Sequence, residues 1–153
     1  MILPQQIFEN LLDLIAKKMK SDRDVNMICT RTDGTNDLDV CYFNNTRCDQ
    51  IYHKIEPIKF VFDQTVFQLK SEGFLKDDIN HVEESNQDIP ACVVDIRSAK
   101  DKDHPDDRRF LMGNTFLKNF YSVYDYDWQN IKLGVNIHSK HIAKAYPYKK
   151  TAW

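Results

Sequence analysis

The sequence predicts a mainly β fold with one amphipathic helix near the N-terminus. Short runs of alternating apolar and polar residues, separated by turn-forming residues, recur between residues 25 and 137 and are typical of β-strands. A long stretch of apolar residues at helical spacing occurs only within the first twenty residues. The chain of 153 residues is 42% hydrophobic and 12% aromatic, which excludes a disordered chain or a coiled coil. This length allows one domain or part of a larger one.

The predicted helix begins at Pro4 and ends where the polar segment 21–24 begins. Pro4 suits the first turn of a helix, where its missing N–H group is not needed. The apolar residues that recur at helical spacing are Ile7, Phe8, Leu11, Leu12, Leu14, Ile15 and Met19. Charged residues fall outside this stripe, so the helix is expected to bury one face.

Five short strands are predicted before residue 97. They span residues 27–29, 38–43, 58–62, 66–69 and 91–96. A turn at 31–36 separates the first two strands, and Asp63-Gln64 connects the next two as a hairpin. The charged segments 76–88 and 98–109 are predicted to be solvated loops, because neither has the ligand order of a calcium-binding EF-hand.

The segment 110–137 has the densest pattern. An apolar strand at 110–112 ends at Gly113, and Asn114 is a suitable N-cap for a short helix. An aromatic strand at 120–124 and an alternating strand at 131–137 follow, with a turn between them. Residues 138–153 form a basic and aromatic tail, interpreted either as a docking tail or as an ordered or frayed terminus.

The charge pattern excludes several classes of function. Twenty-one basic and 23 acidic side chains give a net charge of −2, so nothing indicates a nucleic-acid partner. No apolar run is long enough to span a membrane, and residues 1–20 lack the pattern of a signal peptide. His138 and His141 have no third ligand nearby, so no metal site is expected, and no motif indicates a cofactor.

The even number of cysteines indicates disulfides, and the four residues are Cys29, Cys41, Cys48 and Cys92. None lies in a Cys-x-x-Cys pair, the spacing typical of zinc ribbons and thioredoxin-like sites. Two disulfides imply an oxidising compartment, and the N-glycosylation acceptor sequence that begins at Asn44 points to the same compartment. Because a signal peptide is missing, either the thiols are free or the native chain begins upstream of Met1.

Residues 110–125 have the sequence Phe-Leu-Met-Gly-Asn-Thr-Phe-Leu-Lys-Asn-Phe-Tyr-Ser-Val-Tyr-Asp, and residues 130–135 have the sequence Asn-Ile-Lys-Leu-Gly-Val. This order resembles the C-terminal signature of pepsin-like (family A1) aspartic proteases. The helix after Leu3 and the segment 58–75 follow the order of the same family. The resemblance therefore implies a partial acid-protease C-terminal lobe over residues 1–137, followed by the tail at 138–153.

The resemblance also implies a disulfide pattern. Cys48 and Cys92 bracket the predicted hairpin as the disulfide of the family's C-terminal lobe does. Cys29 and Cys41 are additional cysteines and would most simply pair with each other. In two further departures, Asn114 stands where the family usually has Asp, and both charged loops are longer than in pepsin.

Catalysis in this family requires two aspartates that share one proton, each in an Asp-Thr/Ser-Gly turn. The sequence contains neither form of this motif, and residues 32–35 (Thr-Asp-Gly-Thr) have another order. The resemblance implies that the chain begins just after the second motif, so it is expected to hold no catalytic residue and to be inactive alone. The candidates for the substrate-pocket wall are Leu3, Ser71, Glu72 and Leu111.

The complete enzyme implied by the resemblance hydrolyses polypeptide substrates. Its N-terminal lobe, or another chain, would cover the sheet edge at Leu111 and Met112, whose backbone is expected to be unpaired unless residues 1–20 rearrange. A fragment of such a protease would be secretory, lysosomal-vacuolar or extracellular. The alternative is a degenerate, non-catalytic relative that acts as a protein-binding or structural module in a larger assembly. Disulfides favour the first hypothesis, and free thiols favour the second.

Overall fold

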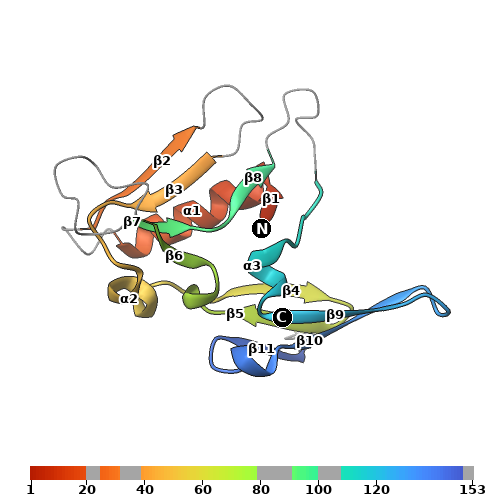
Figure 1. The fold of residues 1–153 in the computed structure, drawn as a ribbon. Helices are drawn as coiled ribbons and strands as arrows, with labels where there is room; N and C mark the ends of the chain where they lie inside the picture. Colours follow the sequence, from red (N-terminus) through yellow and green to blue (C-terminus); the bar gives the residue numbers. More distant parts are fainter. Residues whose placement is uncertain (20–24, 32–38, 79–90, 100–107, 150–153) are drawn as a thin grey trace.

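The computed structural model describes residues 1–19, 25–31, 39–78, 91–99 and 108–149, and confirms the mainly β fold class (Figure 1). The strands are β1 (Ile2–Pro4), β2 (Met27–Arg31), β3 (Asp39–Phe43), β4 (Ile58–Phe62), β5 (Thr65–Leu69), β6 (Leu75–Asp78), β7 (Ala91–Val94), β8 (Arg97–Ala99), β9 (Phe120–Asp125), β10 (Asn130–Val135) and β11 (Ala143–Pro147). The helices are α1 (Gln5–Met19), α2 (Cys48–Ile51) and α3 (Asn114–Leu117), with 3-10 turns η1 (Tyr52–Lys54), η2 (Ser71–Gly73) and η4 (Ile137–Ser139).

Helix α1 confirms the predicted amphipathic helix. Its side chains Phe8, Ile15 and Met19 are buried, and the basic residues Lys17 and Lys18 lie in its last turn. Basic residues at this position interact favourably with the negative end of the helix dipole. The helix therefore presents one apolar face to the core, as its periodicity predicts.

A four-stranded antiparallel sheet has the order β2-β3-β7-β6. The hairpin β2–β3 confirms the strands predicted on either side of the turn at 31–36, although residues 32–38 lie outside the described part of the chain. Strand β6 corrects the prediction of a loop from residue 76, because residues 76–78 pair with β7. Strand β8 likewise corrects the predicted loop at 98–109, because residues 98 and 99 pair with β1.

A second sheet has the order β11-β5-β4. Strands β4 and β5 form the predicted hairpin, and the two residues between them, Asp63 and Gln64, have φ values of 41° and 62°. Positive φ at both central positions is typical of a type I′ turn, whose twist matches that of the strands. Strand β11, from the segment interpreted as a tail, pairs antiparallel with β5 from Ala143 to Pro147.

The segment from residue 110 forms the predicted helix and hairpin with two corrections. The N-cap of α3 is Gly113 rather than Asn114, which is already the first helical residue. Residues 110–112 do not form a strand, and only Leu111 makes an isolated β-bridge. Strands β9 and β10 form an antiparallel hairpin that extends away from the rest of the molecule (Figure 1).

A cluster of phenylalanine rings joins α3 and β9 to the three-stranded sheet. The rings of Phe116 and Phe120 stack with centroids 4.5 Å apart, and Phe120 makes an edge contact with Phe67 at 5.5 Å. Phe116 also makes an edge contact with Phe60 at 5.7 Å. Buried rings in these geometries stabilise a core beyond the area that they bury. None of the helices in the described ranges is long and apolar enough to cross a membrane.

Candidate functional site

The N-terminal strand β1 lies between two segments from much later in the chain. It pairs in parallel with β8, where the N–H of Arg97 donates to the carbonyl oxygen of Met1 at 3.0 Å. On its other side, the amides of Ile2 and Leu111 each donate to the carbonyl oxygen of the other residue at 3.0 Å. The backbone of Leu111 is therefore paired within the chain by residues 1–20, which is one of the three ways in which this edge was expected to be covered.

A buried polar cluster fixes the beginning of β1 against α3. The amine of Met1 donates to Oγ1 of Thr115 at 3.1 Å, and Oγ1 lies 2.7 Å from Oδ2 of Asp95. Thr115 is 2% exposed, and Lys76 approaches Oδ1 of Asp95 at 3.6 Å. Burial lowers the pKa of the Met1 amine, while the charge of Asp95 opposes this shift. The carboxylate of Asp95 thus accepts from a hydroxyl group at one oxygen and lies near a lysine ammonium group at the other.

This cluster does not have the composition of an aspartic protease site. Among the described residues, the carboxylate of Asp95 contacts Thr115 and Lys76, the Met1 amine donates to the backbone carbonyl oxygen of Asp95, and no second carboxylate is found beside it. An aspartic dyad needs two carboxylates that share a proton and activate a water molecule. The segment 32–35, with its related residue types, lies outside the described ranges.

The four predicted pocket-wall residues lie in different places. Leu3 is buried and lines an apolar hollow of about 340 Å³ between α1 and β4. Ser71 and Glu72 line a separate polar hollow of about 430 Å³. The side chain of Leu111 is 53% exposed and contributes to neither hollow. The structure therefore brings Ser71 and Glu72 together but does not join them to Leu3 or Leu111.

The apolar hollow continues beside β4. A second hollow of about 280 Å³ shares Leu11, Ile58 and Lys59 with the first, and both lie between α1 and β4. Most side chains that line the two hollows are hydrophobic, so the hollows can bind apolar groups. The only side chains in these linings that could exchange a proton in catalysis are the charged ones at the rim.

The polar hollow is formed by α2, η1 and η2. The hydroxyl group of Ser71 donates to the carbonyl oxygen of Tyr52 at 2.7 Å, which holds η2 against η1. Burial raises the pKa of Tyr52, and the carboxylates of Asp77, Glu72 and Asp49 raise it further. The sequence reasoning missed this helical segment. The available signal was Gln50, whose side chain accepts from the amide of Arg47, as the third residue of a capped helix does.

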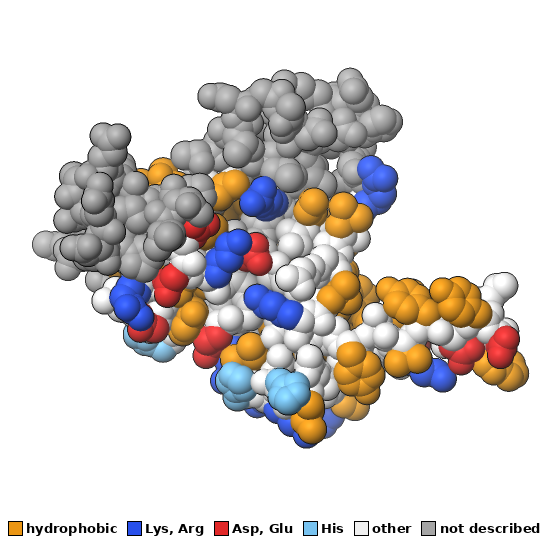
Figure 2. Space-filling view, in the orientation of Figure 1, with side chains coloured by type: hydrophobic (Ala, Val, Ile, Leu, Met, Phe, Trp, Pro, Cys, Tyr) orange, Lys and Arg blue, Asp and Glu red, His pale blue; other side chains and the backbone are white. Residues whose placement is uncertain are grey.

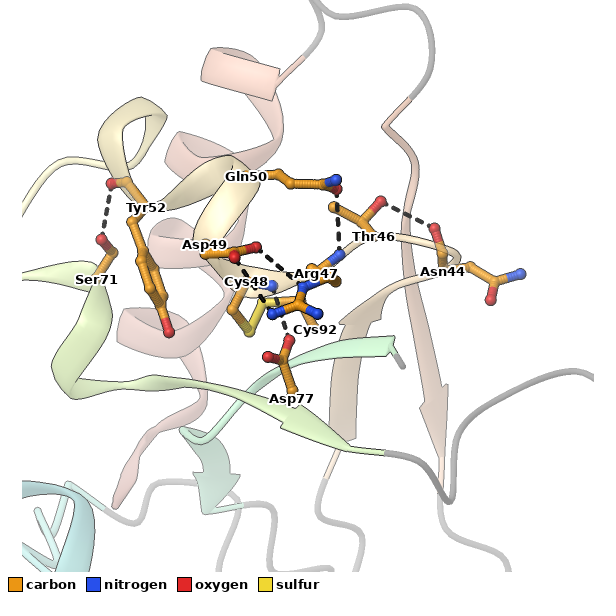
Figure 3. The surroundings of a disulfide bond; sticks show 10 residues. All are labelled: Asn44, Thr46, Arg47, Cys48, Asp49, Gln50, Tyr52, Ser71, Asp77 and Cys92. Carbon is orange, nitrogen blue, oxygen red and sulfur yellow. Dashed lines mark hydrogen bonds and ion pairs between the residues drawn. A yellow bond between two sulfur atoms is a disulfide. The ribbon is translucent and has the colours of Figure 1, made fainter. Parts of the chain in front are cut away.

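Two disulfides are formed, Cys48–Cys92 and Cys29–Cys41, as the resemblance implied. Cys29 and Cys41 are directly opposite each other in the β2–β3 pairing. Figure 3 shows Cys48 at the beginning of α2, beside Asp77. The ligand atoms of Cys48, Cys92 and Asp77 lie within 4.8 Å of one another, but both sulfur atoms belong to the disulfide and are not available to a metal ion.

The hairpin β9–β10 carries the most exposed aromatic residues. Tyr126 and Trp128, at its tip, are 88% and 80% exposed, and further apolar residues along both strands are about half exposed. Figure 2 shows these hydrophobic side chains along the projecting hairpin. In the described part of the chain, neither strand pairs with a third strand. The hairpin therefore presents both apolar side chains and open strand edges, a combination typical of an interaction surface.

Comparison with protein-family models shows the family of the chain. The model of the eukaryotic aspartyl proteases matches residues 1–136. This range includes strand β1 with its two partners, both disulfides and the hairpin β9–β10. The chain belongs to this pepsin-like family. No curated protein and no solved structure matches the chain.

Proposed function

We propose that this chain is the C-terminal-lobe portion of a pepsin-like aspartic endopeptidase and that it does not form an active site alone. The observation that carries the proposal is the match to the family over residues 1–136 in a sequence without an Asp-Thr-Gly or Asp-Ser-Gly motif. Asp95 has no second carboxylate beside it among the described residues, and a lone carboxylate cannot form the proton-sharing pair. The catalytic aspartates would come from polypeptide outside these 153 residues.

The complete enzyme would hydrolyse peptide bonds by activating a water molecule between two aspartates, without a metal ion or a covalent intermediate. In this proposal, the role of the chain is to support that site and to form part of the substrate pocket. Leu3 lies in β1 and Leu111 pairs with Ile2 of the same strand, and these two are the proposed wall residues next to the catalytic turn. Ser71 and Glu72 would contact a substrate only through the separate polar hollow.

The surface proposed for the N-terminal lobe is the hairpin β9–β10. Its open edges offer backbone donors and acceptors to further strands, and its exposed aromatic residues offer apolar contact area. A second lobe that covers this hairpin would remove its apolar side chains from water, which is energetically favourable. The two disulfides support assembly in an oxidising compartment, which is the usual setting of secreted or lysosomal proteases.

The first test compares the purified chain with the protein from its native source. The chain alone should show no pepstatin-sensitive cleavage of a peptide substrate at acid or neutral pH. The native material should be longer than 18.1 kDa, or should contain a second polypeptide with an Asp-Thr/Ser-Gly motif. Pepstatin-sensitive cleavage by the pure 153-residue chain would contradict the proposal.

A second candidate function is a non-catalytic relative that binds another protein. The observation in its favour is Asn114, which replaces a residue that is usually acidic in the family. A native protein of 18.1 kDa that begins at Met1 and copurifies with an unrelated partner would support this function over the first.

A further inference from the structure

The turn between β3 and α2 holds the acceptor sequence Asn44-Asn45-Thr46 in a defined conformation. Asn45 has a φ of 51°, and its N–H donates to Oδ1 of Asn44 at 3.0 Å. The hydroxyl group of Thr46 donates to the backbone carbonyl oxygen of Asn44 at 3.0 Å, and Thr46 is only 4% exposed. These contacts use the carbonyl groups of Asn44 and leave its side-chain nitrogen, Nδ2, without a hydrogen bond to the described residues.

The side chain of Asn44 points away from the disulfide Cys48–Cys92 (Figure 3). In Figure 3 it extends from the turn on the side opposite Cys48 and Cys92. Asn44 is partly exposed and its neighbour Asn45 is exposed, so a large group attached to Nδ2 would extend away from the buried side chains of the described residues. Thr46 would keep its buried contact, because that contact does not involve Nδ2.

An independent observation indicates that the chain folds where N-glycans are attached. Cys48, two residues after Thr46, forms a disulfide with Cys92, and Cys29 forms a second disulfide with Cys41. Disulfides form and persist in the oxidising secretory compartments, which are also the compartments of N-glycosylation. Asn44-Asn45-Thr46 is the only Asn-x-Ser/Thr sequence in the 153 residues, so a glycan would occupy a single site.

We propose that Asn44 carries an N-linked glycan. In the transfer step, Nδ2 of Asn44 forms a bond to the anomeric carbon of the first sugar of a lipid-linked oligosaccharide. The bond between that carbon and the pyrophosphate oxygen of the donor breaks, the lipid pyrophosphate leaves, and Nδ2 loses one proton. No oxidant or reductant is required. The product is an amide-linked sugar at a surface turn of the fold.

The position of this glycan has a consequence for assembly. The end of β3 and the beginning of α2 lie on one side of the molecule, and the hairpin β9–β10 projects from the other side (Figure 1). A glycan at Asn44 would keep its own side in solvent and leave the hairpin free to bind a second lobe. This consequence rests on the proposed function, whereas the glycan itself does not.

The test is to produce the full chain behind a cleavable secretion signal in eukaryotic cells and to measure its intact mass. Asn44→Gln removes the acceptor. Asn45→Gly is the matched control, because it keeps the acceptor sequence and glycine tolerates the positive φ at this position. Thr46→Ser also keeps the acceptor sequence. The wild type and both controls should show a mass increase that a peptide N-glycosidase removes, with one Asn→Asp conversion in the tryptic peptide 32–47.

Total cellular protein is analysed together with secreted protein, so a variant that folds poorly is still scored. A wild-type chain that contains both disulfides but has the mass of the bare polypeptide would overturn the proposal. A glycan that persists in Asn44→Gln would overturn the assignment of the site. Because neither readout depends on peptide hydrolysis, failure of the glycan proposal can be distinguished from failure of the proposed protease function.

Discussion

The backbone amide of Cys48 donates a hydrogen bond of 2.8 Å to Oδ1 of Asp77. Asp77 is directly opposite Cys92 in the β6–β7 pairing, and Cys92 forms the disulfide with Cys48. The beginning of α2 is therefore attached twice to the same pair of residues in the sheet, once covalently and once through a carboxylate (Figure 3).

Removal of this carboxylate should destabilise the protein even when the disulfide is intact. Asp77→Ala is expected to lower the free energy of unfolding by about 1 kcal/mol, the usual net contribution of an intramolecular hydrogen bond, because the carboxylate is exposed. Asp77→Asn keeps an acceptor oxygen and should lose less. Asp49→Ala is the control, because Asp49 forms an exposed ion pair with Arg47 at 3.4 Å that contributes little. Urea denaturation of the oxidised proteins measures the three values, and equal losses for Asp77→Ala and Asp49→Ala would contradict the assignment.

The two disulfides should differ in their contribution to stability. Cys48 and Cys92 are 44 residues apart, and Cys29 and Cys41 are 12 residues apart. The loop-entropy relation gives about 4 kcal/mol for the longer loop and about 3 kcal/mol for the shorter one. Double replacement of Cys48 and Cys92 by alanine should therefore lower the unfolding midpoint in urea more than the corresponding replacement of Cys29 and Cys41. The reverse order would show that strain or residual structure dominates.

Phe116 should be among the most sensitive positions in the core. Its ring is 1% exposed and contacts both Phe60 and Phe120, so Phe116→Ala leaves a cavity between α3 and the three-stranded sheet. The expected loss is about 3 to 5 kcal/mol in the free energy of unfolding. Phe110→Ala removes a ring that is 44% exposed and should cost clearly less. Denaturation monitored by near-ultraviolet circular dichroism tests this, and similar losses at both positions would be inconsistent with the aromatic cluster.

Tyr52 should make the protein less stable at high pH. Burial, followed by nearby carboxylates, raises the pKa of Tyr52 above its ordinary value of about 10. The folded state then holds the phenol proton more tightly than the unfolded state. This contribution to stability is complete below the unfolded-state pKa and is lost as the pH rises through the folded-state pKa. The free energy of unfolding should decrease less steeply above about pH 10 in Tyr52→Phe than in the wild type. Equal slopes for Tyr52→Phe and the wild type would contradict the raised pKa of this phenol.

Substitutions at the tip of β9–β10 should affect assembly and leave the fold unchanged. Tyr126→Ser and Trp128→Ser alter side chains that are mostly exposed, so the free energy of unfolding of the chain should change by about 0.5 kcal/mol or less. Both variants should weaken binding to the lobe that carries the catalytic motif, as measured by calorimetry. Leu14→Ser is the matched control, because Leu14 is an exposed apolar residue on α1, away from the hairpin. Equal weakening by Leu14→Ser would argue against the hairpin as the docking surface.

Local patterns in the sequence predicted most of the elements but not their pairing. The helix α1 and the hairpin β4–β5 follow from periodicity and turn residues that are close together in the chain. The parallel pairing of β1 with β8 depends on residues about 95 positions apart, and strand propensity does not contain that information. Strand β11 was missed because Ala143–Pro147 has little alternation, and its pairing with β5 outweighs its weak local preference.

Of the features in the candidate functional site, only the disulfide pairs could be predicted from the sequence, through its resemblance to the family. The disulfide partners follow from that resemblance, and the cross-strand register places Cys29 opposite Cys41. The polar cluster of Thr115 and Asp95 joins α3 to the turn after β7, and no motif connects two such residues in the sequence. Tyr52 lies on a short helical segment whose position is fixed by the disulfide at Cys48 rather than by helix propensity.

The location of β1 has a consequence for synthesis on the ribosome. Its three residues are synthesised about 95 residues before their partners, which are residues 97–99 and residue 111. The apolar residues of β1 must therefore remain without these partners until about 95 further residues have been synthesised. Contacts of such high sequence separation slow folding and extend the time in which an unpaired strand can associate with another chain. We expect this interval to be the step at which the nascent protein depends most on chaperones.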